Sequence, residues 1–115
     1  MGFSTLRARS EFQRVYSHGA RFSRNGLGFC VRKAEVDDFR FGIAVAKRYG
    51  NAVRRNRLRR QIKEIIRLSA VLPTSVEVVL SVYRPCKFLD FVLLRDTLNW
   101  AFARMGKIKA TNENR

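Results

Sequence analysis

The sequence predicts an α/β (α+β) two-layer sandwich, in which a small sheet packs against a few helices. Three observations predict it. Hydrophobic residues follow a helical or a strand period in the order helix, strand, strand, helix, strand, helix, with room for one more short strand. The chain has 115 residues, which suits one domain. Hydrophobic residues make up 46% of it, which is enough for a buried core.

A short helix is the first predicted element. Residues 10–13 have the S-x-x-Q form of a capping box, which favours a helix start at this point. Phe12, Val15 and Tyr16 then recur at helical spacing, and Gly19 suits the end of the helix. These aromatic side chains either pack in the core or form a binding surface, and the helical period alone fits both interpretations.

Alternating segments predict the strands that follow. A short strand is expected around residues 20–24, and longer strands at 27–33 and 40–48 are separated by a turn at Asp37-Asp38. One face of the second long strand carries only small side chains, which would let another element approach the sheet closely. These side chains are Gly42, Ala44 and Ala46.

A long helix is predicted over residues 52–69. Asn51 is a good N-cap, and Pro73 prevents the helix from continuing. Its apolar residues recur at helical spacing and form the stripe Leu58, Ile62, Ile65 and Ile66.

The last two elements are a strand and a helix. Residues 76–83 are β-branched and nearly all apolar, which is typical of a buried central strand. Asp90 is expected to cap a helix that ends at Gly106, followed by a flexible basic tail at 107–115. The apolar stripe of that helix is Leu94, Leu98, Ala101, Phe102 and Met105. A single domain is therefore expected over residues 1–106.

The charge indicates a polyanionic partner. Twenty-four Lys and Arg face nine Asp and Glu, which gives a net charge of +15. Such a surplus repels itself, and binding to nucleic acid relieves the repulsion and releases counterions. An anionic membrane surface is the weaker alternative, because nucleic acid is the commonest partner of such a charge surplus. No apolar run approaches the length of a membrane span.

Cysteine and histidine usage argues against a metal site and for the cytoplasm. Cys30 and Cys86 are the two cysteines and His18 is the single histidine, with no spacing typical of zinc ligands. Both thiols are expected to be reduced, which suits the cytoplasm. Residues 1–9 lack the apolar run of a signal peptide.

Residues 47–67 are the most informative segment, because nine of them are basic and only Glu64 is acidic. Arg54, Arg55 and Arg57 crowd the helix N-terminus, where the helix dipole already favours anions, so a bound phosphate would relieve an unfavourable arrangement. Arg55 also projects onto the apolar side of the helix, which a simple solvated face does not require. Arginine can bind phosphate through two hydrogen bonds and can stack on bases. We therefore predict RNA binding here.

This segment resembles the signature of the bacterial ribonuclease P protein family, Lys-x-x-Gly-Asn-Ala-Val-x-Arg-Asn-Arg-x-Lys/Arg-Arg. Further similarity lies in residues 12–19, 40–43 and 63–67, and the likeness covers about residues 6–105. The signature is met by Lys47, Gly50, Asn51, Ala52, Val53, Arg55, Asn56, Arg57, Arg59 and Arg60.

The resemblance implies a left-handed β-α-β crossover, although general rules favour a right-handed one. It implies that the long helix contacts a catalytic RNA, and that a cleft beside the first helix holds single-stranded RNA on stacking aromatic side chains. The family often has a third aromatic where Cys30 stands here. The implied RNA contacts are Lys47, Arg48, Asn51, Arg55, Asn56, Arg57, Arg59, Arg60, Lys63 and Arg67. The implied cleft residues are Phe12, Tyr16, Phe29, Cys30 and Arg32.

The implied function is that of the protein subunit of ribonuclease P, an endoribonuclease that removes the 5′ leader of precursor tRNA. The resemblance assigns catalysis to the RNA subunit, with Mg²⁺ bound through that RNA and no organic cofactor. This agrees with the sequence, which offers neither a nucleophile–base pair nor a cluster of metal ligands. The expected partners are the catalytic RNA and precursor tRNA, without DNA or membrane, and the free protein is expected to be a monomer.

Three other functions fit part of the sequence. A general or ribosomal RNA-binding protein would share the charge but would not respond to leader length. A DNA-binding module could use the long basic helix, but no helix-turn-helix spacing precedes it. A membrane-surface helix would need the Leu and Ile stripe to be exposed, whereas the surrounding strands predict that it is buried.

Overall fold

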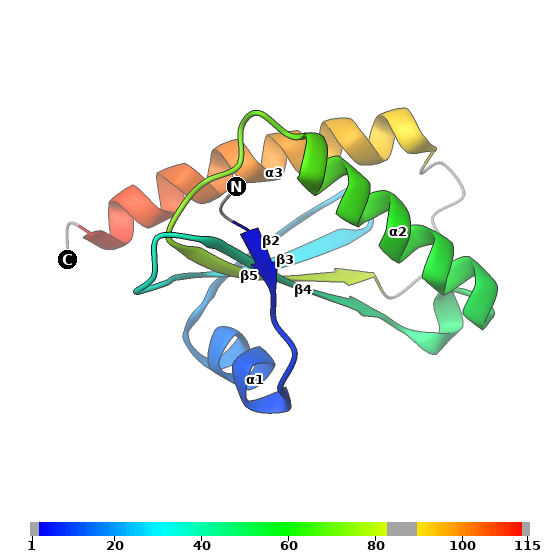
Figure 1. Cartoon of the computed structure of the whole chain (residues 1–115), viewed down its shortest axis with the longest axis horizontal. Helices are drawn as coiled ribbons and strands as arrows, with labels where there is room; N and C mark the ends of the chain where they lie inside the picture. Colours follow the sequence, from blue (N-terminus) through cyan, green and yellow to red (C-terminus); the bar gives the residue numbers. More distant parts are fainter. Residues whose placement is uncertain (1–2, 83–89, 114–115) are drawn as a thin grey trace.

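The structure, a computed structural model, describes residues 3–82 and 90–113. Along the chain lie five strands, three α-helices and one 3₁₀ turn within these residues (Figure 1). Their bounds are β1 Phe3–Thr5, α1 Arg9–His18, β2 Ala20–Arg24, β3 Leu27–Lys33, β4 Phe39–Val45, η1 Lys47–Tyr49, α2 Ala52–Leu68, β5 Val76–Val82 and α3 Phe91–Glu113.

The strands form one mixed sheet in the order β1-β4-β5-β3-β2. β1, β4 and β5 are parallel, and β3 and β2 are antiparallel to their neighbours. β5 lies at the centre, and every one of its residues is buried, as its nearly apolar sequence predicts.

The connection from β4 through α2 to β5 is left-handed. In Figure 1, β4 runs from left to right, α2 returns from right to left above the sheet, and β5 runs from left to right behind β4. The chain thus turns anticlockwise while it moves away from the viewer, which is a left-handed path. The crossover implied by the family resemblance is therefore confirmed, against the general preference for a right hand.

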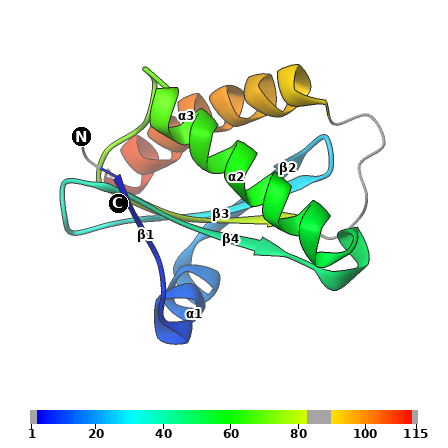
Figure 2. The ribbon, with the colours of Figure 1, turned by 45° about the vertical axis from the view of Figure 1, so that its right-hand side comes forward.

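The helices cover the two faces of the sheet unequally. α2 and α3 lie side by side over one face, and the short α1 lies on the other (Figure 2). The main core is between the sheet and the α2–α3 layer, where both predicted helical stripes are buried. This sheet and helix pair confirm the predicted sandwich. A smaller cluster beneath α1 contains Leu6, Val15, Cys30 and Val79.

The start of the chain differs from the prediction in two ways. β1 was not expected, because three residues are too few to show a strand period. α1 begins at Arg9 with Ala8 as its N-cap, rather than with a cap at Ser10. The carboxylate of Glu11 accepts hydrogen bonds from the backbone N–H groups of Arg7 and Ala8, each at 2.9 Å. Glu11 therefore caps this helix from its third position.

The hairpin of β2 and β3 depends on Asn25 and Gly26, which have φ angles of 53° and 83°. Positive φ at both central residues is what a two-residue hairpin turn of type I′ requires, and Asn-Gly is a favoured pair for it. This turn fixes the expected short strand at residues 20–24 as the edge of the sheet.

The later elements match their predicted ranges, with two exceptions. β4 ends at Val45 instead of continuing to Arg48, because η1 turns the chain there. α3 continues past Gly106 to Glu113, so the predicted end at Gly106 is wrong and residues 107–113 are helical. A glycine in a helix costs about 1 kcal/mol relative to alanine, and the residues that follow it can still propagate the helix. None of the described helices combines the length and apolar composition needed to cross a membrane.

Candidate nucleic-acid interface

α2 presents most of the predicted RNA-contact residues to solvent. Asn51 caps the helix through a 3.0 Å hydrogen bond from the backbone N–H of Arg54 to its Oδ1 atom. This cap places the arginines of the first two turns around the open end of the helix. The exposed members of the predicted set are Lys47, Arg48, Asn51, Asn56, Arg57, Arg60, Lys63 and Arg67, and the half-buried ones are Arg55 and Arg59.

A hollow of about 790 Å³ lies between α2 and the β1 edge of the sheet. Arg57, Arg60 and Lys63 line it from α2, and Phe3 and Phe91 contribute aromatic side chains. The basic face of the helix is therefore recessed against aromatic groups rather than uniformly convex, which suits a nucleotide chain with both phosphates and bases.

Arg55 differs from its neighbours, as its place on the apolar side of the helix predicts. Among the described residues, its Nε is the one buried side-chain nitrogen or oxygen without a hydrogen-bond partner. An unsatisfied buried donor costs free energy, and a charged acceptor at this position would recover it.

Three residues of the predicted set already have side-chain partners on the helix. Arg67 binds Glu64 through two hydrogen bonds of 2.6 and 3.0 Å, which neutralises its charge locally. The Oδ1 atom of Asn56 accepts a hydrogen bond of 3.2 Å from Arg59. Arg57 and Arg60 form no ion pair with the described residues, and they are the stronger candidates for phosphate contact.

On the other face of the sheet, Phe12 lies directly over Gly42. A Cβ atom at Gly42 would be 2.5 Å from Cζ of the ring, so only glycine allows this close approach. The predicted small-residue face of β4 thus accommodates the aromatic ring of α1. A hollow of about 380 Å³ beside Phe12 is also lined by Arg59 and Lys63 of α2, which joins the basic helix to the cleft.

A second hollow, of about 360 Å³, adjoins α1 near its C-terminal end. Tyr16 and Cys30 line it, and the guanidinium of Arg21 lies over the Tyr16 ring at 5.6 Å from its centroid. Cys30 is buried and donates a hydrogen bond of 3.2 Å from its thiol to the carbonyl of Val15. Burial raises the pKa of this thiol, which makes it unreactive. Cys86 lies outside the described residues.

The structure turns the Phe29 side chain away from this cleft, although the residue borders the hollow. Successive residues of β3 point to opposite faces, so Phe29 faces α3 while Cys30 faces α1. Its ring is 2% exposed and stacks on Phe22 with centroids 5.0 Å apart. Phe29 is a core residue, and the place of a third cleft aromatic is taken by the small Cys30.

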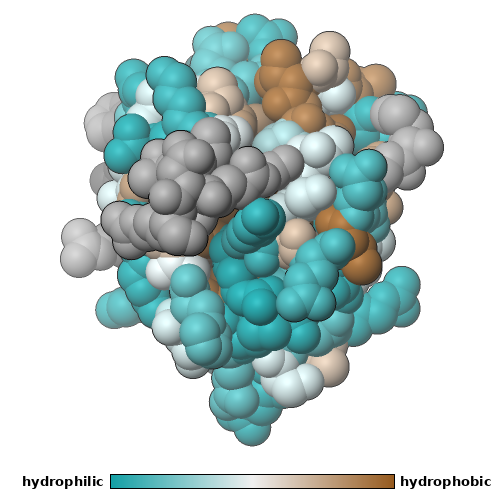
Figure 3. All heavy atoms as spheres, turned by 90° about the vertical axis from the view of Figure 1, so that its left-hand side faces the viewer, coloured by the Kyte–Doolittle hydropathy of each residue, from teal (hydrophilic) through white to brown (hydrophobic). Residues whose placement is uncertain are grey.

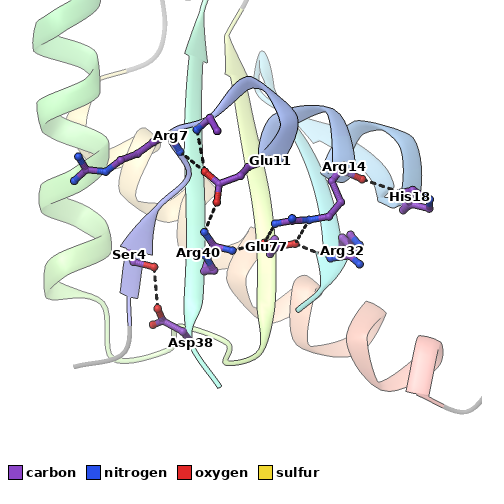
Figure 4. A network of polar contacts seen from close by, with 10 residues as sticks. Ser4, Arg7, Glu11, Arg14, His18, Arg32, Asp38, Arg40 and Glu77 are labelled. Atoms are coloured by element: carbon purple, nitrogen blue, oxygen red, sulfur yellow. Dashed lines mark hydrogen bonds and ion pairs between the residues drawn. The ribbon is translucent and has the colours of Figure 1, made fainter. Parts of the chain in front are cut away.

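Arg32, the last predicted cleft residue, belongs to an ion network centred on Glu77 (Figure 4). Glu77 is 2% exposed, yet it accepts hydrogen bonds from three arginines on three different elements. Arg14 of α1 contacts it at 2.5 and 3.2 Å, Arg32 of β3 at 2.7 Å and Arg40 of β4 at 2.8 Å. Arg40 also binds Glu11, at 2.5 Å. The network therefore fastens α1 to the sheet.

The two carboxylates of this network remain ionised to low pH. Burial alone raises the pKa of Glu77, but the hydrogen bonds from Arg14 and Arg32 outweigh it, so the pKa lies below its ordinary value. For Glu11, the backbone hydrogen bonds at Arg7 and Ala8, together with that of Arg40, lower the pKa to about 2. Both groups are thus fixed negative charges beneath a basic surface.

Sequence reasoning missed this network, although a signal was present. Glu77 is the one acidic residue in an otherwise buried strand, and a buried charge needs opposite charges around it. Arg32 and Arg40 stand directly opposite Glu77 in the two neighbouring strands. Predicting their pairing required the strand order, which the sequence alone did not provide.

One end of the molecule is largely polar. On the end of the molecule seen in Figure 3, hydrophilic residues cover most of the surface and hydrophobic residues form small, separate areas. Within residues 3–82 and 90–113, no three His, Cys, Asp or Glu side chains come together as a metal site requires.

Comparisons with known proteins agree with this geometry. The family model Ribonuclease P matches residues 2–106. The ribonuclease P protein component of Clostridioides difficile is 44% identical over 64 residues, 56% of each chain. That of Bacillus cereus is 31% identical over 103 residues, 88% of this chain and 90% of the relative.

Solved structures agree in fold over nearly the whole chain. The RNase P protein from Thermotoga maritima has a TM-score of 0.76 at 29% identity, covering 88% of this chain and 96% of that one. The RNase P protein of Staphylococcus aureus has a TM-score of 0.77 at 25% identity, covering 90% and 94%. The family model covers more than half of the sequence, so the chain belongs to the ribonuclease P protein family.

Proposed function

We propose that this chain binds the catalytic RNA of ribonuclease P through α2 and the 5′ leader of precursor tRNA through the cleft beside α1. Family membership makes it a ribonuclease P protein component, part of the ribonucleoprotein endoribonuclease that processes tRNA. One observation supports the proposal that the two RNA-binding surfaces act together. Arg59 and Lys63 of α2 line the same hollow as Phe12 of α1, so a basic helix and an aromatic cleft form one continuous surface.

The cleft suits a single strand of variable sequence. Phe12 and Tyr16 are half-buried, so part of each ring remains accessible to an unpaired base. Stacking of a base on an aromatic ring is worth about 1–3 kcal/mol and tolerates any base, because every base has a π-face. The leader would thus be bound without recognition of its base sequence.

In this proposal the chain contributes positive charge to the complex and no catalytic group. Catalysis is assigned to the RNA subunit, which binds Mg²⁺ at its crowded phosphates, and no organic cofactor is needed. Basic residues placed beside those phosphates reduce the number of Mg²⁺ ions needed to hold the complex together. The free protein is proposed to be a cytoplasmic monomer, in keeping with its self-repelling charge and its unreactive, reduced Cys30.

The test is a cleavage assay at low Mg²⁺, with a bacterial ribonuclease P RNA and precursor tRNA, with and without this protein. Restored cleavage at the mature 5′ end, together with no cleavage by the protein alone, is the expected result. Tight RNA binding without stimulation would instead identify a general or ribosomal RNA-binding protein.

A Phe12→Ala variant tests the cleft separately. It should bind leader-bearing precursor less tightly, by about 10-fold or more, because an unpaired base no longer has this ring to stack on. Its affinity for precursor without a leader should not change. Thermal unfolding provides the control, since a decrease of several kcal/mol in stability would mark Phe12 as a core residue instead.

A further inference from the structure

A second group of arginines and aromatic rings lies where β2 meets α3, at the edge of the sheet opposite β1. The guanidinium of Arg24 lies over the Trp100 ring at 4.6 Å from its centroid, and that of Arg104 lies over the Phe22 ring at 5.2 Å and within 5.9 Å of Trp100. Phe22 meets Trp100 edge-on, with centroids 5.7 Å apart. Phe22, Arg24, Trp100 and Arg104 are called the β2–α3 cluster below.

The cluster is held rigidly from both sides. Asn25, in the hairpin turn next to Arg24, donates a hydrogen bond of 2.9 Å to the buried hydroxyl of Thr97 on α3. Thr97, Trp100 and Arg104 follow each other at spacings of three and four residues, so they share one face of that helix. Stacking on rings also removes much of the freedom of long arginine side chains before any ligand arrives.

Within residues 3–82 and 90–113, the two arginines differ from those of the Glu77 network in having no carboxylate partner. Arg14, Arg32 and Arg40 each form an ion pair with Glu77, and Arg40 also pairs with Glu11. In the part of the chain that the structure describes, neither Arg24 nor Arg104 forms an ion pair with an acidic side chain. Two like charges are thus held close to the same ring in a chain of net charge +15, which is unfavourable until an anion binds.

We propose that the β2–α3 cluster is an additional binding site for the phosphodiester backbone of single-stranded RNA. Oriented guanidinium groups can each give two parallel hydrogen bonds to a phosphate, and their outer planes can stack on bases. This site lies apart from the basic face of α2, on the opposite edge of the sheet, and extends beyond the RNA contacts proposed above.

A continuous route leads to this site from the cleft. Phe22 of the cluster also borders the hollow that Tyr16 and Arg21 line. β2 is an edge strand whose alternate side chains point to opposite faces, which places Arg21 on the α1 side and Arg24 on the α3 side. A strand of RNA that leaves the cleft can therefore pass round the β2 edge with an arginine on each side.

Trp100 is the single tryptophan of the chain, so its fluorescence reports on the cluster alone. Titration of a labelled uridine oligoribonucleotide into the free protein should change Trp100 emission in step with the anisotropy of the label. Arg57→Ala/Arg60→Ala and Phe12→Ala variants should keep the Trp100 response, even where they bind RNA less tightly. The proposed function and this further site can thus fail independently.

An Arg24→Gln/Arg104→Gln variant should bind the oligoribonucleotide about fivefold less tightly, and the slope of log affinity against log salt should fall by about 1.4, because two arginines no longer bind phosphate. Arg95→Gln is the matched control, because it removes the same type of charge from the same helix but from an arginine already paired with Asp96. Equal thermal stability of the variants would exclude a folding defect.

Binding assays with reconstituted components identify the source of the strand. If the Arg24→Gln/Arg104→Gln variant loses affinity only for precursor tRNA with a long leader, the site binds the leader. If this variant loses affinity for the catalytic RNA in the absence of precursor tRNA, the site binds the catalytic RNA. The proposal is overturned if the oligoribonucleotide binds without any change in Trp100 emission and the double variant binds every RNA as tightly as the Arg95→Gln control.

Discussion

At the scale of single residues, the cleft depends on side chains whose roles appear only in three dimensions. The small-residue face of β4 was predicted from the sequence, and Gly42 now explains it, because the Phe12 ring occupies the space of a Cβ atom. The role of Glu77 could not be predicted from a sequence pattern of this kind. Its three arginines come from three elements, so no sequence period links them. Phe29 and Cys30 show the same limit, since one residue of register decides which face each side chain reaches.

Replacing Glu77 with Gln should lower the free energy of unfolding by about 3 kcal/mol at neutral pH. The reason is that three guanidinium groups would then surround a buried site without the charge that compensates them. Chemical denaturation of both proteins measures the difference. Glu64→Gln is the control, because Glu64 forms an exposed pair with Arg67, and its removal should cost about 0.5 kcal/mol or less.

The same comparison has a defined pH dependence. The pKa of Glu77 in the folded protein lies below the ordinary value of 4.5, so its contribution to stability is complete above pH 4.5 and disappears as the pH falls through the folded pKa. The difference in stability between the unaltered protein and Glu77→Gln should therefore shrink as the solution is acidified below pH 4.5. A difference that stayed constant down to pH 2 would contradict the ionised state of Glu77.

At the scale of elements, the helices were predictable where a cap and a stripe agree. Asn51 and the buried Leu58, Ile62, Ile65 and Ile66 fixed α2 to within one residue. Elements with weaker local signals were missed or misjudged. β1 is too short to show a period and exists because it pairs with β4. α3 passes Gly106 because one glycine costs only about 1 kcal/mol in a helix, which does not stop the following residues from continuing it.

The basic face of α2 leads to a prediction about RNA affinity. An Arg57→Ala/Arg60→Ala variant should bind the catalytic RNA more weakly, and the slope of log affinity against log salt should decrease by about 2, one unit for each phosphate that the protein no longer binds. Filter binding over a series of salt concentrations measures both quantities. Arg67→Ala should have a smaller effect, because Glu64 already neutralises that side chain. An unchanged slope in the double variant would exclude a phosphate role for Arg57 and Arg60.

At the scale of the whole molecule, arginine-rich surfaces lie towards the two opposite edges of the sheet, one on α2 and one where β2 meets α3. Glu77 and Glu11 meanwhile hold α1 to the sheet. The sequence predicted the sandwich and the polyanionic partner from period and charge. The left hand of the β4–α2–β5 crossover followed only from the family resemblance, because the general physical preference is for the right hand. The crossover matters for function, since it places α2 beside β4, where Arg59 and Lys63 meet the hollow that contains Phe12.

The excess charge predicts that multivalent anions stabilise the free protein beyond the effect of ionic strength. With a net charge of +15 and a row of exposed arginines on α2, the folded state concentrates positive charge that the unfolded chain spreads out. Sulfate or pyrophosphate that occupies phosphate sites on the folded state should raise the midpoint of thermal unfolding by about 5 °C, which corresponds to roughly 1 kcal/mol for a domain of this size. Sodium chloride at equal ionic strength should give a smaller rise, since it screens charge without occupying these sites. The Arg57→Ala/Arg60→Ala variant should show a smaller anion-specific rise, whereas equal rises in chloride and sulfate would show that screening alone is responsible.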